Sequence, residues 1–516
     1  ITDAQDVDIE SVSVQGTAVA NTINIGSNTA IDGTLTIGAG GAAELNTDGA
    51  AGDTGGLRIN ASAGVTVANN TTFDTDGTTA TDGALTFVGG ATFSGTGTFA
   101  NGVTFEVGSN NIDLSAATLS NLDHVLVSTA VNVTLGDITV GDGAGNGNDA
   151  IDVDAAVTGT TTLAGDLATD GEATAGNVAL NGTGNIILAD ADGTVSIDTD
   201  STNDAAVTMG TIVDDGNDRG LTINAGTADV TFTSTIGAAG GNGAIGALTV
   251  DGNDIRFQGN VESGVIDVDA AQGGDDDSIT IDAAVVMDSN GGTQSYASDD
   301  IIIGAGASLT STGAAANIDV TFTGETGATS IAVGSAAAGT LALSEAELQT
   351  VASTFTDINI GVSGAGNQTG AVVINDAAGL DLANTGLTVN ADNGDLTIDS
   401  NISLTNAGSD LTINGDGTTT TLNANILTNG GDVTINDSLD VTGTRTIDTG
   451  NGAPATGGNI TVTGVINSDD ATGDTLTIDA DGTGTDGNVD LQGAIGDTAD
   501  LNALTIQNAA QVDVNN

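Results

Sequence analysis

The stretch "SDLTINGDGTTTTLNANILTNGGDVTIND" (residues 409–437) carries the same short phrase at both ends. In "LTI" and "VTI" an apolar residue, a threonine and a second apolar residue alternate, and a turn-forming Asn follows. This period of two is typical of a strand with one buried face. The phrase recurs along nearly the whole chain, at 34–38, 57–60, 220–224, 247–252, 278–282, 395–399, 475–479 and 503–507.

The intervals between repeats predict a solenoid. From Leu396 the phrase returns at Leu411, Val433, Ile460, Leu476 and Leu504, after 15, 22, 27, 16 and 28 residues. Such irregular spacing suits coils whose loops vary in length while each coil adds strands to continuous parallel sheets. The inner face of a coil is buried only by its neighbours. We therefore predict one continuous right-handed parallel β-helix (β-solenoid) over residues 1–516.

The composition agrees with a thin aliphatic core. The 516 residues include 78 glycines, one proline, one tyrosine, nine phenylalanines, and neither cysteine nor tryptophan. Stability must then come from backbone ladders and the stacking of coils. The mean hydropathy is slightly positive, which argues against disorder. The sequence contains no run of 18 apolar residues, so we expect no membrane insertion.

The net charge of the chain argues against nucleic acid as a partner. Four arginines and no lysine stand against 69 acidic residues, which gives a net charge of -65. Nucleic acid is therefore an improbable partner. Only eight of the acidic residues are glutamate. The preference for aspartate indicates turns, where a short carboxylate bonds to the local backbone or holds a cation.

Clusters of aspartate at turns make calcium the most plausible ligand, because calcium takes six to eight oxygens from carboxylates and carbonyls. Two interpretations stay open: solvated turn aspartates, or at least one ordered calcium ion. The candidate ligands are Asp190, Asp192, Asp214, Asp215, Asp218, Asp275, Asp276, Asp277, Asp479 and Asp481.

Catalysis has little support in the sequence. His124 is the sole histidine, and we interpret it as a turn or packing residue. The enzymes built on β-helices pair carboxylates with basic residues to stabilise anionic substrates. Here the four arginines are scattered, at Arg58, Arg219, Arg256 and Arg445. We expect no enzymatic activity. Outward rows of threonine, which can bind ice or crystalline surfaces, are a weaker alternative.

Two local patterns add detail. Phe87, Phe93, Phe99 and Phe105 recur every six residues. They predict either a three-sided coil, in which Phe87 and Phe105 stack, or ordinary strand–turn–strand arcs. A longer repeat relates "VGSNNIDLSAATLSNLDHV" (107–125) to "VGSAAAGTLALSEAELQTV" (333–351), each followed by "GAGN". This predicts a duplicated module, about 84–200 and about 308–425.

The second copy contains the capping-box pattern "SEAE", with Ser344 as N-cap and Glu347 three residues later. We predict a short helix at 344–352, and a shorter or absent one near 121–126.

These coils, with the interruption "LSEAELQTVASTFTDINIG" (343–361), resemble the filamentous-haemagglutinin-like and β-strand repeat surface proteins of bacteria. The resemblance implies a right-handed parallel β-helix, secretion, and a structural or adhesive role at the cell surface, where polysaccharide is a candidate partner. The chain begins at Ile1 without a leader pattern, which fits a processed secreted protein or an excised segment.

The sequences at both ends suggest self-assembly. "DVDIESVSVQGTAVANTINIG" (6–26) and "LNALTIQNAAQVDVNN" (501–516) read as strands without a capping helix. Open solenoid ends invite another chain to continue the ladder, and such head-to-tail contacts propagate as fibres. We therefore expect a head-to-tail homopolymer, as a filament or a surface-layer lattice. The alternative is the stalk or passenger segment of a large secreted adhesin.

Overall fold

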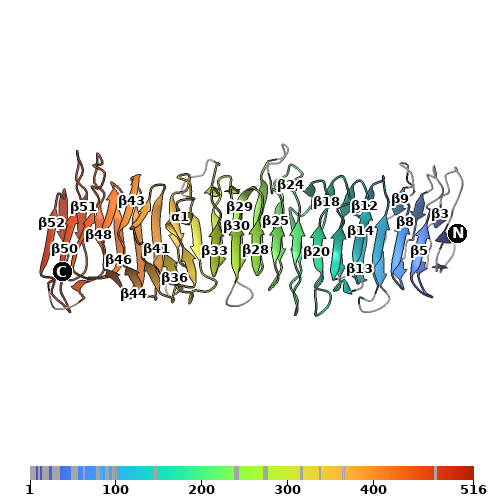
Figure 1. Cartoon of the computed structure of the whole chain (residues 1–516), viewed down its shortest axis with the longest axis horizontal. Coiled ribbons are helices and arrows are strands. Elements are labelled where there is room, and N and C mark those ends of the chain that lie inside the picture. Colours follow the sequence, from blue (N-terminus) through green and yellow to red (C-terminus); the bar gives the residue numbers. More distant parts are fainter. Residues whose placement is uncertain are drawn as a thin grey trace. The chain divides into compact units, whose positions relative to one another are not determined.

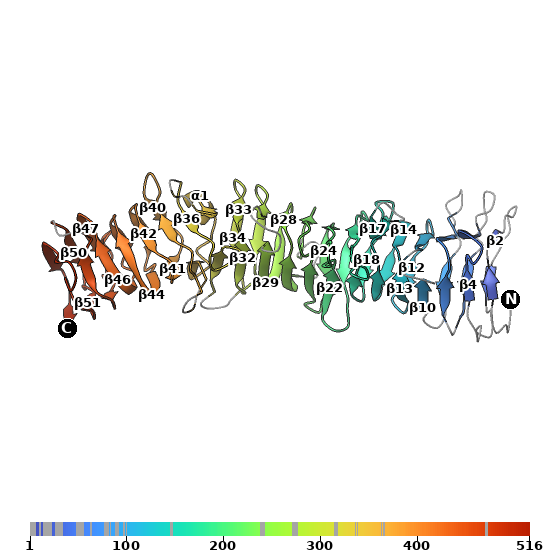
Figure 2. The same ribbon diagram turned by 90° about the horizontal axis from the view of Figure 1, so that it is seen from below.

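The computed structural model contains two compact units, Ile1–Gly264 (unit 1) and Val265–Asn516 (unit 2). Each is a stack of coils made of short parallel strands (Figures 1 and 2). The structure describes residues 7–9, 12–13, 23–25, 35–47, 56–61, 64–76, 82, 84–87, 92–95, 99, 101–144, 148–237, 243–270, 277–313, 318–335, 337, 339–362, 364, 367–469 and 473–515.

The described strands of unit 1 form three sides of a coil. The first side consists of β1 (Val7–Ile9), β4 (Leu35–Ile37), β7 (Val65–Val67), β10 (Thr92–Gly95), β13 (Thr118–Leu122), β16 (Ile138–Val140), β19 (Leu167–Ala168), β22 (Thr194–Asp198), β25 (Gly220–Asn224) and β27 (Ile245–Asp251). The second consists of β2 (Val12–Ser13), β5 (Ala43–Asn46), β8 (Thr71–Asp74), β11 (Val103–Glu106), β14 (Val125–Thr129), β17 (Asp149–Val153), β20 (Asn177–Leu180), β23 (Val207–Met209), β26 (Val230–Phe232) and β28 (Asp254–Phe257). The third consists of β3 (Ile23–Ile25), β6 (Leu57–Ile59), β9 (Leu85–Phe87), β12 (Ile112–Leu114), β15 (Val133–Leu135), β18 (Thr161–Leu163), β21 (Ile186–Leu188) and β24 (Ile212–Asp214).

Strand β29 (Val261–Ala270) includes the boundary between the two units. Unit 2 also has three sides. Its first side continues with β32 (Gln294–Ser298), β35 (Val320–Thr323), β38 (Asp357–Ile360), β41 (Gly386–Asp392), β44 (Leu411–Leu422), β46 (Val433–Val441), β48 (Ile460–Val462), β51 (Asn488–Leu491) and β53 (Gln511–Val514). The second side contains β30 (Ser278–Ile281), β33 (Asp300–Ile303), β36 (Ile331–Val333), β37 (Leu341–Leu343), β39 (Val372–Ile374), β42 (Leu396–Ile398) and β49 (Ile466–Ser468), joined by the second halves of β44 and β46. The third contains β31 (Val286–Asp288), β34 (Ser308–Thr310), β40 (Leu380–Leu382), β43 (Ile402–Ala407), β45 (Ile426–Asn429), β47 (Thr444–Asp448), β50 (Thr475–Asp479) and β52 (Ala503–Gln507).

All recorded pairings between the described strands are parallel and join like positions in successive coils. Leu411 of β44 is in register with Val433 of β46, which is in register with Ile460 of β48. In β46 and β48 the apolar residues of the phrase point inward and are buried, while the threonine between them is half-buried on the outer face. This confirms the predicted parallel β-solenoid. That it is one continuous body over 1–516 stays a prediction, as does the duplicated module. No helix within the described ranges is long and apolar enough to cross a membrane.

The predicted helix is present but shorter than expected. Helix α1 covers Glu345–Leu348, and Ser344 and Glu347 form the predicted capping box. The helix ends early because Val351 returns to the ladder, where it forms a parallel bridge with Leu309. Near 121–126 the chain contains the end of β13 and the start of β14, so the helix is absent there, which is one of the two predicted outcomes.

The phenylalanines line the interior of three successive sides. Phe87, Phe93 and Phe105 belong to β9, β10 and β11, which lie in three different sheets. This agrees with a three-sided coil, but the predicted stacking partner is wrong. Phe105 stacks on Phe73 with ring centroids 5.4 Å apart, and it meets Phe87 edge-on. The reason is that this coil takes more than 18 residues, because Phe105 is in register with Phe73, 32 residues earlier, and Phe99 lies in a bend with φ of 47°.

Candidate functional site

Unit 2 carries exposed apolar side chains at its terminal rung, which we define as strands β52 and β53. In β53, Val512 and Val514 continue two inward-facing columns, because they are in register with the buried Val489 and Leu491. They are nevertheless 45% and 47% exposed. In β52, Leu504 and Ile506 continue the columns of Leu476 and Ile478 and are half-buried.

The backbone of the terminal rung is also open. Among the described strands, β53 pairs only with β51, and β52 pairs only with β50. Each therefore has one strand edge without a recorded partner strand among the described residues. A strand edge beside core-type side chains is a template for another strand.

The first described coil differs. Strands β1, β2 and β3 each have one recorded partner strand, namely β4, β5 and β6. In β1 and β3, the inward residues Ile9, Ile23 and Ile25 are nevertheless buried. These three side chains of the first coil thus differ from the exposed valines of the terminal rung.

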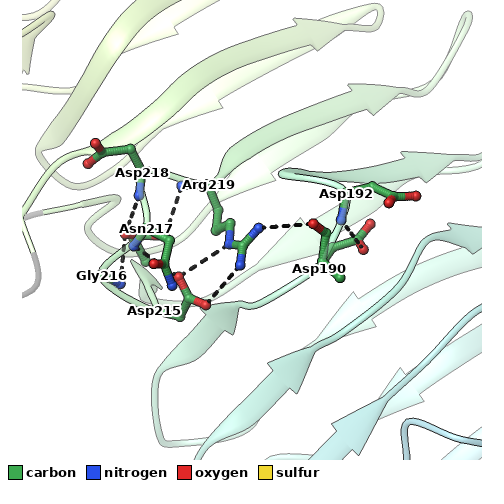
Figure 3. A network of polar contacts seen from close by, with 9 residues as sticks. Asp190, Asp192, Asp215, Gly216, Asn217, Asp218 and Arg219 are labelled. Carbon is green, nitrogen blue, oxygen red and sulfur yellow. Dashed lines mark hydrogen bonds and ion pairs between the residues drawn. The ribbon is translucent and has the colours of Figure 1, made fainter.

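The predicted calcium ligands fall into separate turns. Asp190 and Asp192 lie in one turn, and Asp214, Asp215 and Asp218 lie in the corresponding turn of the next coil (Figure 3). In unit 2, Asp479 is the last residue of β50, and Asp481 lies in the turn that follows it. Asp277 is buried beside β30, whereas Asp275 and Asp276 lie outside the described residues.

Most of the carboxylates in the first two turns already have partners. Asp214 is fully buried and accepts hydrogen bonds from the backbone N–H groups of Gly216, Asp218 and Arg219, at 2.8, 2.8 and 2.9 Å. Asp190 accepts one from the N–H of Asp192 at 3.1 Å. These contacts give the aspartates a structural role in shaping the turns.

Arg219 joins the two turns. Its guanidinium donates to both carboxylate oxygens of Asp215, at 3.3 and 3.4 Å, and to the carbonyl oxygen of Ala191, at 3.4 Å (Figure 3). Burial acts to raise the pKa of Asp215, but hydrogen bonds from Asn217 and Arg219 and the charge of Arg219 outweigh it and hold this pKa below its usual value. The guanidinium of Arg219 therefore supplies a positive charge between the two turns, at the Asp215 carboxylate.

Over the described part of the chain, no group of three or more acidic or histidine side chains is arranged to hold a metal ion. We therefore derive no function from a metal. That calcium binds these turns stays a prediction.

Sequence reasoning missed a column of aspartates and asparagines that runs between coils of unit 2. Each residue stands at or directly before the start of a first-side strand. Gly386 interrupts the column between Asp357 and Asp410, and on either side of it a side-chain oxygen accepts the backbone N–H of the next member. The donor–acceptor distances are 3.2 Å from Asp357 N to Asp319 Oδ1, 2.7 Å from Asp432 N to Asp410 Oδ1, 2.7 Å from Asn459 N to Asp432 Oδ1, and 3.0 Å from Asn488 N to Asn459 Oδ1. The signal was present in the sequence, as an Asp or Asn directly before the repeated phrase.

Stacked carboxylates perturb one another in this column. Burial, followed by the negative charges of Asp319 and Asp410, raises the pKa of Asp357 to about 6. In unit 1, burial and the charges of Asp149 and Asp154 raise the pKa of Asp152, also to about 6.

His124 is buried, and its Nδ1 lies 2.7 Å from Oδ2 of the buried Asp123. Gly102 accommodates the ring, because a Cβ at this glycine would lie 2.3 Å from it. This environment supports the interpretation of His124 as a packing residue.

Comparisons of the chain with protein-family models, with curated proteins and with solved structures found no match.

Proposed function

We propose that this chain is an extracellular structural protein of the bacterial cell surface, a subunit that assembles through end-to-end contacts of its solenoid coils into a filament or a surface-layer lattice. The observation that carries the proposal is the terminal rung, where exposed core-type valines lie beside strand edges that have no recorded partner among the described residues. The occupant we propose is the first coil of a second copy, strands β1 to β3. Such a contact is heterologous and does not close on itself, so it yields fibres.

The pattern of the two rungs supports this choice. Val512–Asp513–Val514 of β53 and Val7–Asp8–Ile9 of β1 share the order apolar, aspartate, apolar. If β1 of one copy continued the sheet beyond β53 of another, the apolar side chains would extend the buried columns. The aspartates would extend the outer column that already pairs Asp490 with Asp513.

A second function, the stalk or passenger segment of a large adhesin, is favoured by one observation. Ile9, Ile23 and Ile25 of the first coil are already buried, so a partner arriving there gains strand pairing but little further burial of these side chains. In this alternative the valines of the terminal rung are covered by a further coil of a longer chain.

Electron microscopy of the purified 516-residue protein separates the two functions. Assembly predicts fibres that lengthen with protein concentration, whereas the stalk predicts single particles at every concentration.

The variant Val512→Lys/Val514→Lys should abolish fibres, because two charges would be buried in the contact. Ile302→Lys is the matched control, since Ile302 is 45% exposed and lies far along the sequence, in β33. A lattice held by calcium further predicts that a chelator disperses it.

A further inference from the structure

The outer face of unit 2 has a polar hollow of about 320 Å³ over strands β35, β38, β41 and β44. Its volume is at the lower end of the range for small-molecule sites. It is lined by Thr321, Thr323, Asn359, Gly361, Val362, Thr388, Asn390 and Asn414.

The hollow exists because one outward column lacks a side chain. The registers place Gly361 between Thr323 of the preceding first-side strand and Asn390 of the following one. Gly361 has φ of +83°, and a Cβ there would lie 2.3 Å from the carbonyl oxygen of Asn390. The backbone therefore requires glycine at this position. With strands about 4.8 Å apart, the missing side chain leaves a gap of roughly two rung spacings.

Three side chains of the neighbouring column face this gap with free hydrogen-bonding groups. Thr321, Asn359 and Thr388 follow one another in register on β35, β38 and β41. All three are half-buried, and their side chains make no hydrogen bond within the described part of the chain.

The floor of the hollow is held in place by amides. Asn390 Nδ2 donates to the carbonyl oxygen of Gly361 at 3.3 Å, and Asn414 Nδ2 donates to Asn390 Oδ1 at 2.9 Å. These bonds fix which way each amide points, so the remaining donor and acceptor sites are preorganised.

We propose that this hollow binds a neutral sugar unit of a polysaccharide. None of its eight lining residues is charged, although the chain carries 69 acidic residues. An ionic ligand would find no counter-charge in it. Hydroxyls and amides both donate and accept hydrogen bonds, which matches the hydroxyl groups of a sugar. The threonine methyl groups and Val362 supply apolar contact for the C–H groups.

The affinity of one hollow is expected to be weak, on the order of a millimolar dissociation constant, because its lining contains no aromatic ring. The site does not depend on assembly. In a filament, however, repeated copies would raise the overall avidity.

Saturation-transfer NMR with the full chain tests the proposal. The probes are the methyl glycosides of glucose, galactose, mannose and N-acetylglucosamine, their neutral disaccharides, and glucuronate as the charged comparison. The test variant is Thr321→Val/Thr388→Val, which removes two hydroxyl groups and keeps the shape. The control is Thr434→Val/Thr461→Val, two half-buried threonines of the same face, outside the hollow.

We expect at least one neutral probe to bind with saturation, the test variant to weaken it by on the order of tenfold, and the control to leave it unchanged. The proposal is overturned if no neutral probe binds, if both variants weaken binding equally, or if glucuronate binds more tightly than the neutral sugars. Equal melting temperatures of the two variants show that both are folded. None of these results depends on whether fibres form.

Discussion

The backbone N–H of Asp432 donates to Asp410 Oδ1, 22 residues earlier, at 2.7 Å, and so links one coil of unit 2 to the next. This contact offers a physical reason for the preference for aspartate over glutamate. A short side chain at the start of a strand can accept the N–H of the next rung, about 4.8 Å away, with few rotamers to fix. Asparagine has the same reach, since Asn459 Oδ1 accepts the backbone N–H of Asn488 at 3.0 Å.

Substitutions at Asp410 separate the hydrogen bond from the charge. Asp410→Ala leaves the N–H of Asp432 without its acceptor, and we expect a loss of about 1 kcal/mol in the free energy of unfolding. Asp410→Asn keeps an acceptor of the same reach and relieves repulsion from Asp432, so we expect stability equal to or above that of the wild type. Urea denaturation measures both. Equal destabilisation by the two substitutions would contradict a role for the acceptor.

The raised pKa of Asp357 predicts a pH dependence of stability. In the folded protein this carboxyl holds its proton up to about pH 6, whereas its usual pKa is 3.8. The folded state therefore binds more protons between these values, and stability falls as the pH rises from about 4 to about 6. After allowance for solvent screening, the contribution is about 1 kcal/mol.

Asp357→Asn should remove this part of the dependence, so that the variant gains stability relative to the wild type at pH 7 and not at pH 4. Asp395→Asn is the control, because Asp395 is exposed and also stands just before a strand, β42. Melting temperatures across this pH range decide the matter, and parallel curves for Asp357→Asn and the wild type would count against the interpretation.

The fold was predictable from the repeated phrase because alternation and turn residues act locally. The sequence did not reveal on which side of the coil each phrase lies. Leu411, Val433 and Ile460 share one inner column, whereas Leu396 lies on the second side and Leu476 on the third. Some intervals between phrases therefore equal the length of a full coil, and others are the distance from one side of a coil to another side. Only the pairing between rungs, a long-range property, separates them.

The candidate sites were less predictable for the same reason. Adjacent aspartates in a turn are visible in the sequence. The contact of Arg219 with the carbonyl oxygen of Ala191 is not, because the two residues belong to successive coils. The hollow at Gly361 likewise depends on Thr323 and Asn390, which neighbouring coils supply.

Charge at the terminal rung should control assembly. In the proposed contact Asp513 meets Asp8 of the next copy, and two carboxylates about 4.8 Å apart repel by about 0.9 kcal/mol even at the dielectric of water. Asp513→Asn should therefore lower the concentration at which fibres form, by roughly fourfold. Asp500→Asn, at an exposed loop position before β52, makes the same change of charge and should have little effect. Sedimentation of fibres against protein concentration measures the threshold, and equal thresholds would refute the contact.

Removing Arg219 tests whether the aspartate turns of unit 1 can hold calcium. The guanidinium now occupies the position between the Asp215 carboxylate and the Ala191 carbonyl, both of which are oxygen ligands of the kind that calcium prefers. In Arg219→Ser these oxygens lose their cation, and we expect Ca²⁺ to bind on the order of tenfold more tightly than to the wild type.

Arg445→Ser, the same change of charge in unit 2, is the control. The double variant Asp215→Asn/Arg219→Ser should lose the gain, because it removes the carboxylate charge. Calorimetric titration with CaCl₂ compares the four proteins. A similar gain in Arg445→Ser would show that only net charge changed, and no gain in Arg219→Ser would exclude these turns as a latent calcium site.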